Sequence, residues 1–88
     1  MLAPWAAYQL HRHTTADGYV MAFRRSKSTS ASLTVSLVDI DPQRHYEVEW
    51  RPEFSVDYTQ NLSGSSLANL TITLEAVSQS VLVMYRAQ

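Results

Sequence analysis

The sequence contains no cysteine and no excess of charge of either sign. Without cysteine the chain has no disulfide framework and no thiolate ligand for a metal, so nothing indicates an oxidising compartment. Seven basic and eight acidic residues give a formal net charge of −1, which creates no field that would attract a nucleic-acid backbone or an anionic lipid surface. We therefore expect neither nucleic acid nor a membrane as a partner, and the missing cysteine favours a cytoplasmic location.

Long apolar runs are also missing. The N-terminal segment MLAPWAAYQL is apolar, but it is too short for a membrane span and has no basic residue before its apolar part, so we interpret it as the start of the folded domain. The chain does have 45% hydrophobic residues and only 17% charged residues, a balance that is typical of packed globular domains. Its 88 residues predict a single domain, residues 1–88, with a small core.

Helical periodicity is a third absence. No stretch keeps apolar residues at three- and four-residue spacing for long enough to form a full helix, and no internal repeat is present. Apolar and polar residues alternate instead, and turn residues interrupt this alternation about every ten residues. The sequence therefore predicts an all-β fold, a single antiparallel β-sandwich of about seven to eight short strands.

The alternation and the turn residues predict where the strands lie. The expected strands cover residues 5–12, 19–25, 33–37, 46–50, 54–58, 70–74 and 80–87. A hairpin turn is expected at residues 14–18, because the Asp17-Gly18 pair tolerates a positive φ. The segment SGSSLANL, residues 63–70, predicts one helical turn with a serine cap. Residues 80–87 are apolar on both faces, so this strand is expected in the centre of a sheet.

Two arginines end the expected strand 19–25. Alternation puts Arg24 on the side of Val20 and Ala22. It puts Arg25 on the opposite side, with Met21. The two guanidinium groups cannot then form one clamp for an anion, and we interpret the pair as the end of a strand.

The histidines are the candidates for a metal site. His11 and His13 are two residues apart, a spacing that on a strand projects both imidazoles to one face. Asp17 or His45 could supply a third ligand, but neither is fixed by spacing. Polar histidines at a strand end before a turn are far more common than metal ligands. We therefore predict no metal and no cofactor.

Carboxylates and serines provide no convincing catalytic arrangement. With Glu53 and Asp57, the acidic residues Glu47 and Glu49 could in principle supply the acid and base of a glycosidase. However, Glu47 and Glu49 lie on the polar side of an alternating strand, where ionised carboxylates need no function. No serine stands in a Gly-x-Ser-x-Gly elbow. We predict no catalytic residue in this chain.

Aromatic residues are the candidates for ligand binding. The apolar faces of sugars pack on aromatic rings, so exposed aromatics could form a carbohydrate platform. Such residues more often fill the core of a sandwich. The candidates for a carbohydrate or interdomain contact are Trp5, Tyr8, Tyr19 and Trp50.

Five segments follow one another in a recognisable order. They are WAAYQLHR, DGYVMAFRRSKS, LVDIDPQRHYEV, LSGSSLANLTITL and SVLVMYR, and together they extend from Trp5 to Arg86. This order resembles the C-terminal β-sandwich of bacterial α-galactosidases and related proteins of glycoside hydrolase family 36. There a Trp-x-x-Tyr-Gln strand precedes a strand ending in Phe-Arg-Arg, and the closing strand ends in Tyr-Arg. One departure is Asp39-Ile40, where the family usually has Gly-Leu.

The resemblance implies a role without catalysis. The nucleophile and the acid/base of the family are aspartates in Lys-Trp-Asp and Gly-Gly-Arg-x-Asp contexts, and this sequence has neither context. They belong to a separate (β/α)₈ barrel, which needs about 250 residues. The expected function is a non-catalytic C-terminal accessory domain of an α-galactosidase-like glycoside hydrolase, acting in carbohydrate metabolism and packed against a catalytic barrel that is absent from this chain.

The contact face of such a domain is expected to be an apolar patch that involves Trp5, Met21 or Phe23. The same patch could promote a homo-oligomer. Two alternatives stay open at this point. One is a carbohydrate-binding module that uses exposed aromatics, and the other is a standalone interaction domain that associates with itself.

Overall fold

The computed structural model describes residues 4–52 and 58–88. The described residues form seven strands and one helical turn: β1 Trp5–Arg12, β2 Asp17–Arg24, β3 Ser32–Ser36, β4 His45–Pro52, β5 Tyr58–Ser63, α1 Gly64–Leu67, β6 Asn69–Thr73 and β7 Ser80–Ala87. Every strand pair is antiparallel. The predicted all-β fold, a small antiparallel sandwich, is confirmed.

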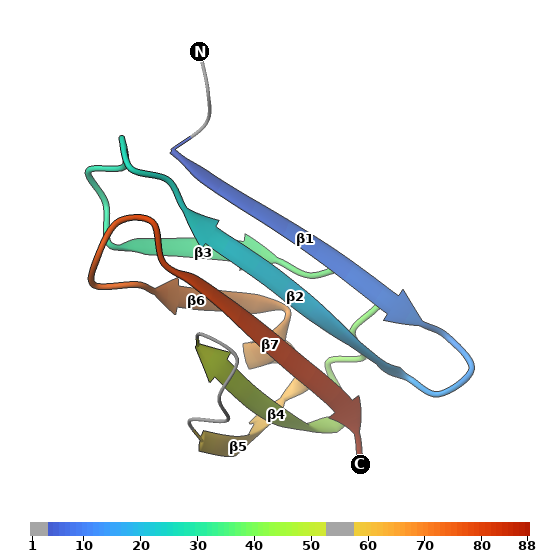
Figure 1. Ribbon diagram of the computed structural model, residues 1–88. Helices are drawn as coiled ribbons and strands as arrows, with labels where there is room; N and C mark the ends of the chain where they lie inside the picture. Colours follow the sequence, from blue (N-terminus) through green and yellow to red (C-terminus); the bar gives the residue numbers. More distant parts are fainter. Residues whose placement is uncertain (1–3, 53–57) are drawn as a thin grey trace.

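The strands form two sheets of unequal size (Figure 1). The larger sheet has five strands in the order β1-β2-β7-β4-β5, and the smaller sheet consists of β3 and β6. Because β7 pairs with β2 on one side and β4 on the other, it is the central strand, as its two apolar faces predicted. The small sheet packs on one face of the large one, and a single core lies between them.

Period-two alternation selects the residues that enter this core. The inner side chains of the three middle strands are Val20, Ala22 and Arg24 from β2, Val81, Val83 and Tyr85 from β7, and Tyr46 and Val48 from β4. The small sheet contributes Leu70 and Ile72 from β6. Full burial of an aliphatic side chain of this size contributes roughly 1.5–3 kcal/mol, so these residues hold the two sheets together.

Arg24 is a charged residue inside this core. Its side chain donates from Nη1 to the Leu74 carbonyl at 2.8 Å and from Nη2 to the Ser28 carbonyl at 3.2 Å. Both acceptors lie outside the strands of the large sheet, so the guanidinium joins β2 to the segment after β6 and to the loop before β3. The predicted position of Arg24 on the side of Val20 and Ala22 is confirmed.

The first hairpin differs from its prediction. The positive φ, 51°, belongs to Ala16, and Gly18 has no positive φ and lies within β2. A Cβ added to Gly18 would lie 2.1 Å from the Leu10 carbonyl oxygen and 2.6 Å from the Tyr85 hydroxyl. Glycine is therefore required here by the close approach of both neighbouring strands. The expectation of a positive φ at the Asp-Gly pair was wrong, because the turn is formed before it.

The region after β4 was predicted only in part. Residues 54–57 of the expected strand 54–58 lie outside the described residues. β5 instead runs from Tyr58 to Ser63 and pairs with β4. Its sequence, YTQNLS, is polar and lacks the apolar alternation by which the other strands were found.

The predicted helical turn is confirmed as α1, Gly64–Leu67. Ser63 is its N-cap, and its Oγ accepts a hydrogen bond from the Ser66 amide at 3.2 Å. Leu67 is fully buried and anchors the turn in the core. Within residues 4–52 and 58–88, the structure contains no helix with the length and apolar character needed to cross a membrane.

Candidate functional site

The face of the five-stranded sheet that points away from the small sheet, here called the outer face, carries large apolar side chains. They are between 36% and 66% exposed. We call this group the apolar patch: Tyr8 and Leu10 on β1, Tyr19, Met21 and Phe23 on β2, and Met84 on β7. The patch lies on β1, β2 and β7, which contain the first two and the last of the segments that resemble family 36.

Strand register gathers the patch into a continuous surface. Two rows cross the strands β1, β2 and β7, with Tyr8, Met21 and Leu82 in one row and Leu10, Tyr19 and Met84 in the next. Side chains directly opposite one another on paired strands have Cβ atoms about 4.5–5.5 Å apart, so each row is in contact across the sheet. Contiguous exposed apolar surface of this kind marks interaction sites.

A row of alternating charges closes one end of the patch. It consists of Arg12, Asp17, Arg86 and Glu47 on four adjacent strands. Arg12 donates from Nε to Asp17 at 2.8 Å, and Arg86 donates to Glu47 at 3.0 Å. The hydrogen bond from Arg12, with a second from the Thr15 hydroxyl, lowers the pKa of Asp17 to about 2. The row is paired internally, so its net charge is zero.

A hollow of about 490 Å³ lies where the patch meets this charged row. Three carboxylates line it, those of Asp17, Glu47 and Glu49. Each is held by an arginine: Arg12, Arg86 and Arg51 respectively. Glu47 and Glu49, considered above for glycoside hydrolysis, are thus engaged in ion pairs, while Glu53 and Asp57 lie outside the described residues.

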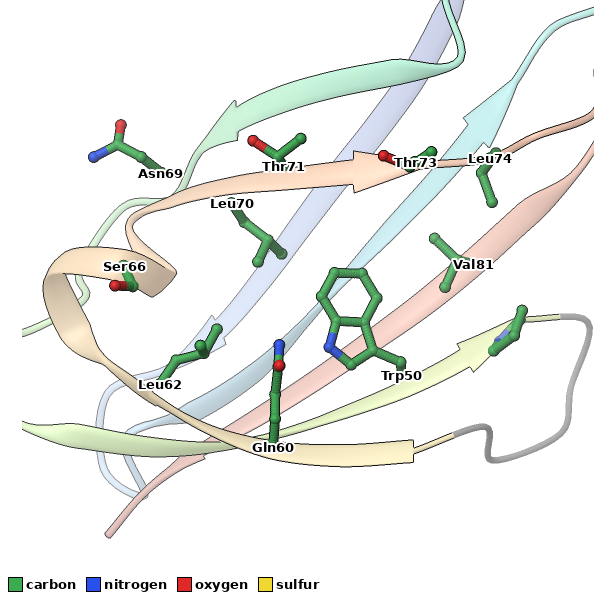
Figure 2. Close-up of a pocket in the computed structure, with 11 residues that line it drawn as sticks. Trp50, Gln60, Leu62, Ser66, Asn69, Leu70, Thr71, Thr73, Leu74 and Val81 are labelled. Carbon is green, nitrogen blue, oxygen red and sulfur yellow. The ribbon is translucent and has the colours of Figure 1, made fainter.

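The structure separates the four aromatic candidates. Tyr8 and Tyr19 belong to the apolar patch. Trp5 is only 8% exposed, and its indole Nε1 donates to the Ser30 carbonyl at 3.1 Å, so it lies in the core. Trp50 is half-buried on the inner side of β4, in a cleft below β6 (Figure 2). The four residues are therefore distributed over three places.

The residues expected in the apolar contact face, Trp5, Met21 and Phe23, can be compared with the observed apolar patch. Met21 and Phe23 are exposed on the outer face beside Tyr8, whereas Trp5 lies on the inner side of β1. Sequence reasoning did not name Leu10 or Met84 for this patch. Both could have been found by extending the two-residue period along their strands, since Leu10 follows Tyr8 at that spacing.

The Tyr85 hydroxyl anchors a polar cluster at one end of the inner face. It accepts a hydrogen bond from Gln9 Nε2 at 2.9 Å and lies 2.9 Å from His11 Nδ1. The Gln9 amide also donates to the Val38 carbonyl at 3.0 Å and accepts from the Val38 amide at 2.9 Å. Burial raises the pKa of Tyr85. These contacts connect β1 to the segment after β3, which is a structural role.

The candidate metal ligands do not all come together. The rings of His11 and His13 are neighbours, with centroids 5.1 Å apart in an edge-to-face arrangement. However, His11 contacts the Tyr85 hydroxyl, and Nε2 of His13 is 3.6 Å from a carboxylate oxygen of Asp39. Asp17 is bound to an arginine, and His45 begins β4, separated from β1 by two strands. In the described part of the chain, no three His, Cys, Asp or Glu side chains form a group that could hold a metal ion.

The chain was compared with protein-family models, with curated proteins and with solved structures. The segments that carry the resemblance to family 36 cover β1, β2, β6 and nearly all of β7, but only part of β4 and β5 and none of β3. No family model, curated protein or solved structure matches the chain.

Proposed function

We propose that this chain is a non-catalytic accessory domain of an α-galactosidase-like glycoside hydrolase, and that the apolar patch docks on the catalytic barrel of that enzyme. The resemblance of the five segments supports the enzyme class. The apolar patch supports the docking role, and it is the observation on which the proposal depends. The absence of cysteine supports the cytoplasm as the location within the same proposal.

The energetic argument concerns apolar surface that remains in contact with water. Removing apolar surface from water contributes roughly 25 cal/mol per Å², and interdomain interfaces bury on the order of 600–1,500 Å². A small domain that keeps six large apolar side chains on one flat sheet face gains most by covering that face. A barrel surface of matching apolar character is a suitable cover.

The charged row would set the orientation of the docked domain. Arg12, Asp17, Arg86 and Glu47 already neutralise one another, so a partner needs no net charge opposite them. Paired charges at an interface rim contribute little to affinity, but they disfavour a misplaced partner. The patch would therefore supply most of the affinity, and the row would supply register.

The test uses the chain together with the barrel of an α-galactosidase-type enzyme from which the C-terminal sandwich has been deleted. We expect a one-to-one complex in sedimentation and a higher Tm for the barrel. Met21→Lys should weaken the complex by about tenfold or more, because a lysine at the centre of the interface would be buried without a partner. Thr59→Lys is the matched control, since Thr59 is an exposed residue of β5, outside the patch.

Three outcomes would contradict the proposal. Turnover of a nitrophenyl α-galactoside by the pure chain would show catalysis. Equal binding by the Met21→Lys and Thr59→Lys variants would show that another surface docks. A stable homodimer that Met21→Lys dissociates, with no affinity for the barrel, would favour the self-associating domain instead.

A further inference from the structure

A second concave surface lies between the two sheets, next to the edge of β6 that faces away from β3 (Figure 2). This cleft has a volume of about 440 Å³, which is within the usual range for small-molecule sites. Its apolar lining is made of Trp50 and Pro52 from β4, Leu62 from β5, Leu70 and Leu74 in and after β6, and Val81 from β7. It opens on the opposite side of the large sheet from the apolar patch.

The unequal sheet sizes explain why the cleft exists. Two strands lie over five, so the inner sides of β4 and β5 are covered only in part. Trp50 and Leu62 are accordingly half-buried, whereas Val48, earlier on the same strand as Trp50, is fully buried. The indole of Trp50 stands between β4 and β6, where it forms part of the floor (Figure 2).

An amide side chain lines the same cleft. Gln60 on β5 stands beside the Trp50 indole, whereas the amide of Asn69, at the start of β6, points away from the ring (Figure 2). Within the part of the chain that the structure describes, the Gln60 amide forms no hydrogen bond. It therefore has two N–H donors and a carbonyl acceptor available to a ligand. The Ser66 hydroxyl adds a second polar group to the rim.

The backbone of β6 adds further polar groups. The Leu74 amide donates to the Ala31 carbonyl at 2.8 Å, which sets the phase of hydrogen bonding between β6 and β3. Because backbone groups alternate in direction along an antiparallel strand, those of Ile72 point toward β3 and those of Thr71 and Thr73 point toward the cleft. The cleft wall is thus a row of alternating backbone donors and acceptors.

We propose that this cleft binds a neutral carbohydrate, with the Trp50 ring against the apolar face of one sugar residue and the Gln60 amide on its hydroxyl groups. None of the described residues that line the cleft is ionisable, so a charged ligand would find no counter-charge there. A sugar combines an apolar C–H face with a rim of hydroxyls that donate and accept. That combination matches an indole floor with amide and backbone walls.

An extended peptide could also pair with the edge of β6 that faces away from β3, but the lining of the cleft favours the sugar. A strand with an apolar side chain over Gln60 would bury the amide of Gln60 without a partner, and burying a polar group in that way costs free energy. Sugar hydroxyls would satisfy it. The proposal does not depend on the docking role of the outer face.

The test uses Trp50 as its own reporter. In a Trp5→Phe background Trp50 is the remaining tryptophan of the chain. We expect saturable changes in its fluorescence and in NMR amide shifts with melibiose, raffinose or cellotetraose as neutral probes. Galacturonic acid should bind more weakly than galactose, since the described lining of the cleft carries no cation.

The decisive variants are neighbours in sequence. Gln60→Ala should weaken binding by about tenfold through the lost hydrogen bonds. Asn61→Ala is the matched control, because Asn61 is exposed on the other side of β5 and does not line the cleft. Met21→Lys, which tests the apolar patch, should leave sugar binding unchanged, so the two proposals can fail separately.

Several results would overturn the proposal. One is the absence of saturation by all three neutral probes up to about 10 mM, with the variant shown to be folded by its amide spectrum. A second is equal loss of binding in the Gln60→Ala and Asn61→Ala variants. A third is saturable binding of an extended peptide at this cleft without binding of any sugar, which would identify a strand-addition site.

Discussion

The inner and outer faces of the five-stranded sheet are built by the same strands, yet they have different roles. On β7, Val83 is 0% exposed and points into the core, whereas the next residue, Met84, is 38% exposed and points to solvent. Both side chains are apolar, so composition does not distinguish them. The difference arises because β3 and β6 cover one face and leave the other bare. Whether an apolar side chain of the large sheet is exposed therefore depends on whether the small sheet covers its face. The face that is not covered is the one that a partner could contact.

The inner face also differs from the outer face in how its polar groups are satisfied. Arg24 on the inner face donates from Nη1 and Nη2 to two backbone carbonyls, while its buried Nε has no hydrogen-bond partner among the described residues. The arginines on the outer face instead pair with carboxylates in water, as Arg12 does with Asp17. Removing a partner from a buried charged donor is costly, while exposed ion pairs contribute little. Substitutions on the two faces should therefore differ sharply in their cost.

The largest effect is expected for Gly18→Ala, on the inner face. The new Cβ would clash with the Leu10 carbonyl, 2.1 Å away, and with the Tyr85 hydroxyl at 2.6 Å. Relieving the clash requires the strands to separate, so we expect a loss of about 3 kcal/mol in the free energy of unfolding. Urea denaturation measures it. Ala16→Gly is the control, because φ is 51° at Ala16 and glycine accepts that conformation, so its stability should be unchanged or slightly higher.

A direct comparison of the faces uses two adjacent residues of β7. Val83→Ala should lower the free energy of unfolding by about 2 kcal/mol, because it leaves a cavity in a fully packed core. Met84→Ala should change it by less than about 0.5 kcal/mol, because an exposed side chain leaves no cavity. Urea midpoints at equal m-values provide the measurement. Equal losses for the two variants would mean that the outer face is covered in solution.

The smallest effect is expected for Asp17→Asn, in the charged row. The pKa of Asp17 is lowered from 3.8 to about 2 in the folded chain, so its ion pair contributes stability above pH 3.8. That contribution declines below pH 3.8 and is lost as the pH falls through about 2. The wild-type chain should be slightly more stable than the variant at pH 6, and the difference should vanish below about pH 2. Denaturation at several pH values tests this, and a difference that grows on acidification would contradict it.

Local patterns were sufficient for most of the strands but not for every site residue. The run of apolar residues on both faces located β7, and the serine at position 63 located the helical turn. The position of β5 was not predicted, because its sequence is polar and its strand conformation depends on pairing with β4. The positive φ of the first turn lies at Ala16 because the turn is formed before the Asp-Gly pair. Gly18 is instead required by the close approach of the neighbouring strands, a constraint that no local pattern reveals.

The candidate sites depended even more on long-range contacts. Tyr8 and Tyr19 were named from the sequence as contact residues, and they lie in the apolar patch. Trp5 was named with them but lies in the core. It is on β1, the edge strand of the large sheet, and its indole Nε1 donates a hydrogen bond to the Ser30 carbonyl in the loop before β3. The cleft around Trp50 and Gln60 had no sequence signal as a unit, since its walls come from strands far apart in the chain.

The sequence by itself determined which side chains share a face of each strand, because a two-residue period depends only on the local backbone. It also determined that the chain is all-β and that β7 is central, since only a buried strand is apolar on both sides. The tertiary structure alone decided which apolar face is covered and where the cleft opens. Both follow from the placement of two strands over five, and such pairing is a property of contacts between distant segments rather than of any one segment.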